Sequence, residues 1–371
     1  MCRSRPAYRR LRRLSLAGPL LALVLVGMVA CAPSGAAPSQ PPNAGGGTSG
    51  ASGSPAALEG APAGSSASAG AGGATVTPAP LAHVRYGMPA SSIQYFYLTV
   101  AQEQGFYREQ GLDAELQLAA ANAILAALTA GELDYTAGLP GGVRLALRGG
   151  PVKVASVVTL QSFTLLTRPD ITAPTQLRGK PVAISSPGAI SEQAMRRALA
   201  HLGLDPQNDV TAIAMGDPAV QWQALQAGAV EAAALTLPYS VLAERDGYRV
   251  WVRTDTLLRA ANTGLVAPQE RIDHRRDEVV RVLRAEQAAV AWMRAHRDEG
   301  AALLAAHVDM APDVARAVYD AGLETYVDPT DLDALRDAVE AVIANESAAG
   351  GVEAKGWNDL VDPTLAREAA R

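Results

Sequence analysis

The feature that most constrains the fold of this chain is an internal repeat. The segment Ala127–Asp134 (ALTAGELD) aligns without a gap with Ala224–Glu231 (ALQAGAVE), at an offset of 97 residues. Each copy reads as a helix end, a glycine cap and an acidic residue that opens a buried strand. Gly203-Leu204-Asp205 echoes Gly111-Leu112-Asp113 in the same order. The repeat therefore predicts two similar lobes rather than a solenoid, which needs more copies.

Around the repeat, short apolar strands alternate with amphipathic helices, which is the pattern of an α/β fold. We expect strands at Val84–Gly87 and Pro181–Ile184, each followed by a loop and a helix. Ligands bind beyond the carboxyl ends of strands in open α/β sheets. The sequence therefore predicts a ligand cleft between the lobes. We expect four loops to line it, namely 88–94, 138–142, 185–191 and 235–239.

The carboxy-terminal part of the chain is predicted to be helical. It follows a return strand at Thr263–Ala267. Apolar residues then recur at helical spacing. The expected helices are Arg275–Arg294, Glu299–Ala306, Pro312–Asp320 and Leu332–Asn345. We expect these helices to pack on the outside of one lobe.

Residues 1–30 have the character of an export signal. Six arginines precede an apolar stretch, Leu14–Ala30, that is shorter than the roughly 20 apolar residues needed to span a bilayer. Met28-Val29-Ala30-Cys31 resembles a bacterial lipoprotein box, in which the cysteine becomes acylated. We therefore expect an exported protein that Cys31 anchors to the extracytoplasmic face of the cell membrane. A simple secretory signal with a chance cysteine is the alternative, and a twin-arginine export route through Arg12-Arg13 stays open.

A low-complexity segment follows the signal. Of the 49 residues from 32 to 80, 44 are Ala, Gly, Ser, Pro or Thr, and Glu59 is the only charged residue. Such a segment cannot bury enough apolar surface to offset the entropy of ordering its backbone. We therefore expect residues 31–81 to comprise the lipidated cysteine and a disordered linker that lets a folded domain stand away from the membrane.

Charge and cysteine content exclude several classes of protein. The chain has 32 Lys and Arg against 37 Asp and Glu, whereas a protein that binds nucleic acid normally carries a basic surplus. Its two cysteines, Cys2 and Cys31, cannot build a disulfide framework or a thiolate zinc site in the folded part. The five histidines lack metal-ligand spacing, and no nucleophile elbow or P-loop occurs. We expect a monomeric binding protein with no catalytic residues, cofactor or metal.

Several motifs resemble one family of binding proteins. The stretch Tyr97–Asp113 (YLTVAQEQGFYREQGLD) is similar to the signature of substrate-binding proteins of ABC importers, of the nitrate, sulfonate, taurine and thiamine-precursor type. Leu128–Asp134 (LTAGELD) and Leu177–Ala183 (LRGKPVA) agree with the same family, and Arg281–Ala306 resembles its carboxy-terminal helices. The resemblance spans roughly residues 84–319, which is most of the folded part.

This resemblance implies a type II periplasmic-binding fold. In that α/β fold two lobes are joined by two crossings and close on the solute like a hinged clamp. The crossings are expected near Thr167–Pro174 and Arg253–Asn262. Lobe 1 then comprises residues 82–170 plus 260–371, and lobe 2 comprises residues 171–259. The closed protein is expected to deliver a small organic or oxyanionic solute to a membrane permease that an ATPase drives.

Helix starts at the cleft loops carry residues suited to hold a solute. Ser91 and Ser92 precede one predicted helix, Ser185–Ser191 another and Gly141-Gly142 a third. Free backbone N–H groups and the helix dipole favour anionic or polar groups at such places. Ordinary N-capping by the same residue types is the alternative.

The family resemblance, carried to the matching loop positions, implies a set of ligand-binding residues. They are Ser91, Ser92, Gln94, Leu139, Gly141, Ser186, Gly188 and Ala189, with Thr236 and Tyr239 added from the fourth loop. Tyr97 is included because an aromatic face near the first loop can stack on a flat heterocycle, with core packing as the alternative. No arginine or lysine lies within these loops, which disfavours a simple oxyanion.

Two other functions stay open. One is an enzyme on the same fold, similar to the pyrimidine-forming thiamine-precursor synthases, which are intracellular and carry a cysteine-rich iron-binding motif. The predicted folded part, residues 82–371, contains no cysteine. The other is a binding module that reports to a membrane sensor. Neighbouring genes for a permease and an ATPase, or for a histidine kinase or chemoreceptor, would separate an importer from a sensor.

Overall fold

The computed structural model describes residues 80–371. The expected export signal, Cys31 and most of the expected linker lie outside the described residues. Within 80–371, no helix is both long enough and apolar enough to cross a membrane.

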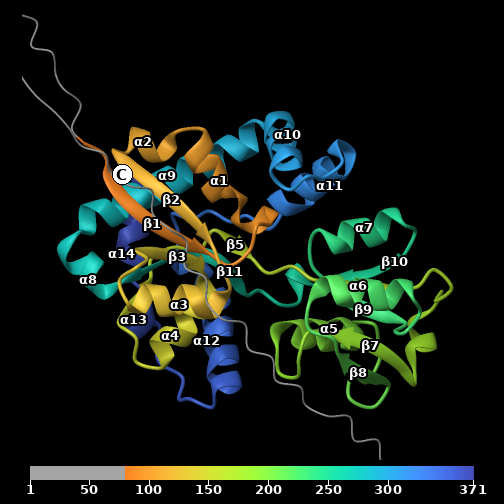
Figure 1. Cartoon of the computed structure of the whole chain (residues 1–371). Coiled ribbons are helices and arrows are strands. Elements are labelled where there is room, and N and C mark those ends of the chain that lie inside the picture. The colour runs from red at the N-terminus through yellow and green to blue at the C-terminus, as the bar shows by residue number, and fades with distance from the viewer. Residues whose placement is uncertain (1–79) are drawn as a thin grey trace, which may run out of the picture. The chain divides into compact units, whose positions relative to one another are not determined.

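The first sheet contains strands that precede the second sheet in the sequence and one strand, β11, that follows it (Figure 1). Its order is β2-β1-β3-β11-β4, and β5 also pairs with β11. The strands are β1 (Ala82–Met88), β2 (Leu112–Leu118), β3 (Tyr135–Gly138), β4 (Val152–Val154), β5 (Thr159–Leu160) and β11 (Ala261–Pro268). β1 runs parallel to β2 and β3, whereas β11 is antiparallel to its partners. We call this sheet and its helices lobe 1.

The second sheet is formed by the middle of the chain and has the order β10-β6-β9-β7-β8. Its strands are β6 (Thr164–Thr167), β7 (Lys180–Ile184), β8 (Val210–Ala214), β9 (Ala232–Leu235) and β10 (Arg249–Arg253). β7 is parallel to β8 and β9, and β6 is antiparallel to β9 and β10. We call this sheet and its helices lobe 2.

The two sheets share one arrangement, as the internal repeat predicted. The order β2-β1-β3-β11 corresponds to β8-β7-β9-β6, and in each case the last strand is antiparallel to the third. Gly87 pairs with Thr136 in the first sheet, and Ala183 pairs with Ala233 in the second. The repeat in the sequence therefore corresponds to a repeated structural unit, one in each lobe.

Helices cover both faces of each sheet. The helices of lobe 1 are α1 (Phe96–Glu103), α2 (Phe106–Glu109), α3 (Ala121–Thr129), α4 (Leu139–Leu147), α8 (Gln269–His274), α9 (Arg276–Ala295), α10 (Arg297–His307), α11 (Pro312–Leu323), α12 (Arg336–Gly350), α13 (Trp357–Leu360) and α14 (Pro363–Ala369). α9 packs with α1, α2 and α14, while α12 packs on α4 at the other face (Figure 1). The expected carboxy-terminal helices are thus present, within a few residues of their predicted bounds.

The helices of lobe 2 are α5 (Ile190–His201), α6 (Pro218–Gln226) and α7 (Tyr239–Arg245). The alternating side chains of β7 show which face of the second sheet α5 and α6 cover. Val182 and Ile184 belong to the same buried cluster as α5, whereas Ala183 belongs to the cluster of Trp222 and Leu225 on α6. Successive side chains of a strand point to opposite faces of its sheet. α5 therefore covers one face of the second sheet and α6 the other.

Glycines end equivalent helices in the two lobes. Gly131 follows α3 with φ +74°, and Gly228 follows α6 with φ +70°. Both angles lie in the left-handed region that an L side chain rarely adopts, so glycine is the suitable residue at these caps. The repeated Ala-Gly pair in the sequence thus marks the same backbone turn in each lobe.

The chain passes between the lobes twice, and the first passage lies earlier than predicted. Strand β6, which the sequence analysis placed in lobe 1, pairs with β9 of the second sheet. The first passage is therefore at 161–163, and the second runs from the end of β10 to the start of β11. The two passages contact each other, because Gln161 N–H donates to Ala260 O at 2.8 Å and Thr254 N–H donates to Phe163 O at 2.8 Å.

The segment 138–142, expected as a glycine-rich loop, is mostly helical. α4 begins at Leu139 and carries Pro140, Gly141 and Gly142 in its first turn. Proline suits the first turn of a helix because the backbone N–H that it lacks has no intrahelical acceptor there. A Cβ on Gly142 would lie 2.7 Å from the Val266 side chain, so this glycine lets α4 approach β11 closely.

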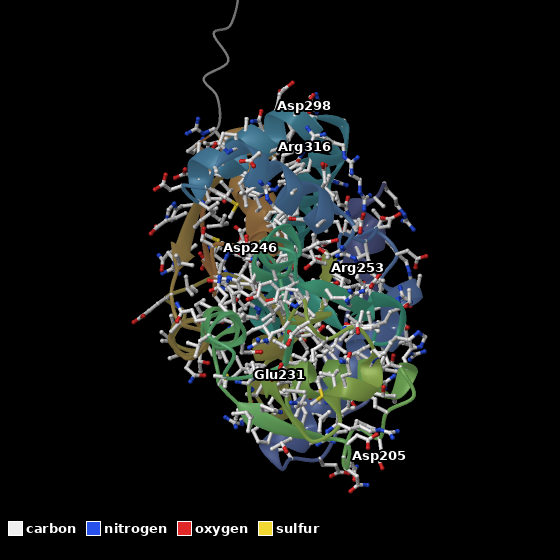
Figure 2. The ribbon with its side chains drawn as sticks, turned by 90° about the vertical axis from the view of Figure 1, so that its right-hand side faces the viewer. Asp205, Glu231, Asp246, Arg253, Asp298 and Arg316 are labelled. Carbon is white, nitrogen blue, oxygen red and sulfur yellow. The ribbon has the colours of Figure 1, made fainter. Side chains whose placement is uncertain are left out.

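The helices α10 and α11 are joined by charges at their exposed side. Arg316 of α11 donates to Asp298 of α10, and the two side chains lie side by side in Figure 2. Arg316 also donates through Nε to Asp320, at 2.7 Å. Exposed ion pairs of this kind contribute little stability singly, so the pairing mainly orients the two helices.

Candidate functional site

Residues of both lobes line a cavity of about 330 Å³, which we call the inter-lobe cavity. Ser185 directly follows β7, and Thr236 directly follows β9, so the cavity lies at the carboxyl ends of the central strands of lobe 2. This is where ligands bind in open α/β sheets. The lining residues are Pro140, Arg144, Gln161, Phe163, Ser185, Ser186, Pro187, Ala189, Ile190, Ser191, Pro218, Gln221, Ala234, Thr236, Asn345, Glu346 and Ala349.

The lobe 2 wall is built from the loop after β7 and the first turn of α5. Ser185 Oγ and Ser191 Oγ share a hydrogen bond, and Ser185 N–H donates to Ser191 Oγ at 3.2 Å. In the first turn of α5 the Glu192 N–H donates to Ala189 O at 3.0 Å, whereas the N–H groups of Ile190 and Ser191 have no backbone acceptor in the described part of the chain. Gly188 N–H is already bound to Glu192 Oε2 at 2.6 Å, and this hydrogen bond lowers the pKa of Glu192. Ser186 is exposed, so its hydroxyl can reach a ligand.

The lobe 1 wall is formed by α4 and α12. Arg144 of α4 donates through Nε to Oε2 of Glu346 on α12, at 2.6 Å, and this hydrogen bond raises the pKa of Arg144. The Arg144 side chain is 38% exposed and that of Glu346 is 6% exposed. Glu346 is thus held in the wall by the guanidinium that covers it. The arrangement brings a cation to the cavity.

Two contacts bridge the lobes on either side of the passages. Gln193 of α5 donates through Nε2 to Oδ1 of Asn345 on α12, at 2.6 Å. Arg245 of α7 pairs with Asp313 of α11. Each contact joins a lobe 2 helix to a lobe 1 helix from the carboxy-terminal segment. Together they hold the lobes against each other.

Three predicted ligand residues line the inter-lobe cavity, namely Ser186, Ala189 and Thr236. The others lie elsewhere. Ser91 and Ser92 line a crevice beside His307 of α10 that has no room for a water molecule. Gln94 and Tyr97 are buried in lobe 1, where the ring of Tyr97 packs edge-on against Tyr326.

The four remaining predicted residues do not line the inter-lobe cavity. Leu139 is fully buried, and Gly141 faces the Leu125 side chain. Gly188 lies in the loop before α5, and Tyr239 begins α7 and packs against the core of lobe 2. A role of these residues in ligand contact stays a prediction.

Sequence reasoning missed the charged and amide side chains of the wall, including Arg144, Gln221, Asn345 and Glu346. Arg144 was overlooked because the loop was expected to end at Gly142. With α4 beginning at Leu139, Arg144 lies four residues after Pro140 and therefore on the same helix face. Asn345 and Glu346 lie far in the sequence from the four predicted cleft loops, and no motif around them indicates a ligand site.

The structure has two larger hollows. One, of about 830 Å³, is bordered by α3, α4 and α12 and shares Arg144 and Ala349 with the inter-lobe cavity. The other, of about 460 Å³, contains Asp134 and Arg271, which pair with each other. Arg85, Glu278 and Arg275 also belong to that network, in which each carboxylate pairs with two guanidinium groups. Asp134 precedes β3, at the strand end opposite to the one where ligands bind. Among residues 80–371, no group of three or more His, Cys, Asp or Glu side chains is placed to hold a metal.

Comparison with known proteins agrees with this geometry. A family model described as "NMT1/THI5 like" matches residues 92–300, more than half of the chain. No curated protein matches the sequence. The solved periplasmic aliphatic sulphonate binding protein SsuA from Escherichia coli is 19% identical, with a TM-score of 0.62, over 75% of this chain and 91% of that one.

Two further structures show how widely the fold is used. The desulfurization enzyme DSZB is 19% identical, with a TM-score of 0.58, over 78% of this chain and 99% of that one. The Candida albicans CA3427 product, described as having the generic periplasmic binding protein fold, is 16% identical with a TM-score of 0.53, over 76% and 96%. These likenesses confirm the predicted α/β periplasmic binding protein fold.

Proposed function

Because the chain belongs to the NMT1/THI5-like family, we propose that it is an extracytoplasmic solute-binding lipoprotein that delivers a small organic or oxyanionic solute to an ABC importer. The observation that carries this proposal is the inter-lobe cavity, where hydroxyls of one lobe face a guanidinium of the other. Its volume of about 330 Å³ suits a small solute. The sulphonate-binding relative supports the same role.

The two passages between the lobes supply the hinge. Their backbones are joined by the hydrogen bonds Gln161 N–H to Ala260 O and Thr254 N–H to Phe163 O. Two bonded segments outside the sheets can bend together while the sheets on either side stay rigid. Solute captured between the lobes stabilises the closed arrangement because it contacts both walls at once. A permease then recognises the closed protein.

Specific side chains would hold the solute. Ser186 and Thr236 supply hydroxyls from lobe 2, and the first turn of α5 supplies backbone N–H groups. Arg144 supplies guanidinium nitrogens from lobe 1, because only its Nε is bound to Glu346. Arginine is well suited to carboxylate, sulfonate or phosphate oxygens because it offers several donors in a plane.

A thermal-shift screen of the purified chain tests this function. The panel contains sulfonates, nitrate, bicarbonate, pyrimidines, flavins and aromatic acids. A true ligand raises the unfolding temperature in a manner that scales with its concentration. Calorimetry with Ser186→Ala should then show weaker binding. The matched control is Thr211→Ala, because Thr211 is exposed on the edge strand β8 and does not line the cavity. A panel without any hit would contradict the proposal.

The lipid anchor is tested separately from solute binding. Cells expressing the full chain are labelled with an alkyne fatty acid, and membrane and soluble fractions are compared. We expect label on the wild-type chain in the membrane fraction and none on the Cys31→Ala variant, with the solute affinity of the folded part unchanged. Label that persists in Cys31→Ala would exclude this cysteine as the anchor.

The two alternatives are separated by what happens to the bound solute and by the membrane partner. The desulfurization enzyme with the same fold shows that this architecture also supports catalysis. Mass spectrometry of a solute after prolonged incubation with the protein detects conversion, which we do not expect. Cross-linking in membranes identifies the partner, and recovery of a sensor kinase or chemoreceptor instead of a permease would favour the sensor.

A further inference from the structure

We propose that the inter-lobe cavity selects solutes of zero net charge that carry N–H donors at one end and an acceptor group at the other. The inference rests on the proposed solute-binding function and names the class of solute. It follows from the charge balance of the cavity wall and from one buried acceptor, Gln221 Oε1.

The wall of the inter-lobe cavity is electrically balanced. Its ionisable lining residues are Arg144 and Glu346, and they are paired through Nε and Oε2 at 2.6 Å. The remaining polar lining groups are neutral hydroxyls and amides. A solute that enters this cavity therefore meets one positive and one negative group side by side.

A net anion would be disfavoured beside this pair. Glu346 is 6% exposed, so a second negative charge near it is poorly screened by water. An anion on the free guanidinium nitrogens of Arg144 would lie beside the Glu346 carboxylate, and the repulsion between the two negative charges opposes the attraction of the guanidinium. A dipolar solute instead leaves the pair intact, with its acceptor group on the free guanidinium nitrogens.

Gln221 supplies the acceptor at the other wall. This residue lies on α6, lines the cavity and is 2% exposed. Its Nε2 donates to Gly216 O at 3.0 Å, whereas Oε1 has no hydrogen-bond partner in the described part of the chain. A buried acceptor without a donor is costly, and an N–H group of a solute would satisfy it.

The first experiment measures affinity for pairs of related probes, of which one member is net-neutral with N–H donors and the other is anionic. Calorimetry compares 2-aminoethanesulfonate with ethanesulfonate, 3-aminopropanoate with propanoate, and cytosine with orotate. We expect the net-neutral member of at least one pair to bind at least tenfold more tightly than its anionic counterpart. Anions that bind as tightly as their neutral partners would overturn the inference and leave the solute-binding function standing. Binding by neither member of any pair would contradict the inference, and, together with a thermal-shift panel without any hit, it would contradict the solute-binding function as well.

Charge variants of α12 test the role of Glu346. In Glu346→Gln the cavity gains a net positive charge, so the preference should move toward the anionic probes by tenfold or more. Glu340→Gln is the matched control, because Glu340 is exposed on the same helix and pairs with Arg336 instead. An unchanged preference in Glu346→Gln would contradict the charge argument.

A second variant tests the acceptor. Gln221→Met removes Oε1 with little change in volume and should weaken the net-neutral probe at least tenfold. Gln221→Glu retains acceptor oxygens but loses the donor to Gly216, so it should retain the preference for an N–H group. The control is Gln223→Met, on an exposed position of the same helix. Equal loss in Gln221→Met and Gln221→Glu would assign Gln221 a structural role through Gly216 and overturn its role as acceptor.

Discussion

Arg144 and Glu346 are 202 residues apart in the sequence, yet Arg144 Nε lies 2.6 Å from Glu346 Oε2. The pair joins α4, which begins at the carboxyl end of β3, to the carboxy-terminal helix α12. Through it the last part of the chain becomes a wall of the inter-lobe cavity. The candidate ligand site is therefore shared among the duplicated unit and the helices that follow it.

Removing one partner of the Arg144–Glu346 pair should lower the free energy of unfolding more than removing both partners together. Arg144→Ala leaves the buried Glu346 carboxylate without its partner, which we expect to lower the free energy of unfolding by about 2 kcal/mol. In the double variant Arg144→Ala/Glu346→Ala no charge is left unpaired, so the loss should be smaller than the sum of the two single losses. Urea denaturation measures all three, and strictly additive losses would show that the two side chains are not coupled.

The stability of lobe 1 should fall as pH rises through the neutral range. Glu286 of α9 is 1% exposed, and its carboxylate lies near the buried hydroxyls of Tyr86, Tyr97 and Tyr107. Burial raises the pKa of Glu286 to about 8. The unfolded chain therefore loses this proton at lower pH than the folded chain does.

The sign of the effect follows from proton binding. Between pH 4.5 and about 8 the folded state holds the Glu286 proton that the unfolded state has released, so stability declines with rising pH by on the order of 5 kcal/mol in total. Glu286→Gln cannot ionise and should remove this decline. Unfolding temperatures measured from pH 4 to 9 test the difference, and parallel curves for the two proteins would contradict the assignment.

Two adjacent glycines of α4 should respond in opposite ways to alanine. Gly142→Ala places a Cβ 2.7 Å from the Val266 side chain, so we expect a loss of about 1–3 kcal/mol. Gly141→Ala meets Leu125 at an ordinary 3.5 Å and should be neutral or stabilising by up to about 1 kcal/mol, because alanine favours helix. Thermal unfolding of both variants measures this, and equal effects would contradict the close approach of α4 to β11.

The bridge between α5 and α12 should slow the opening of the lobes. Gln193→Ala removes the hydrogen bond to Asn345, worth about 1 kcal/mol, so a bound solute should dissociate about fivefold faster. Stopped-flow release of a ligand measures the rate, and small-angle scattering measures the opening. Gln223→Ala, at an exposed position of α6, is the control. An unchanged release rate in Gln193→Ala would show that this contact does not limit opening.

Local signals in the sequence were sufficient for the architecture. The glycine caps at Gly131 and Gly228, the periodicity of the strands and helices, and the family motif from Tyr97 to Asp113 all depend on residues close together in the chain. Backbone conformation and hydrophobic periodicity are encoded over a few turns, so two like lobes could be predicted. The loop predicted at 138–142 was wrong because Pro140 begins a helix rather than breaking one.

The composition of the candidate ligand site was decided only by tertiary structure. Ser186, Ala189 and Thr236 lie in loops from which the family resemblance predicted ligand contacts, and they line the cavity, whereas Arg144 and Glu346 meet only when α12 packs on α4. Such a contact depends on packing between elements that are far apart in the sequence. The residues around Arg144 and around Glu346 therefore do not indicate that the two side chains meet. The sequence alone determined two lobes with a cleft between them, and the folded chain decided which charges face that cleft.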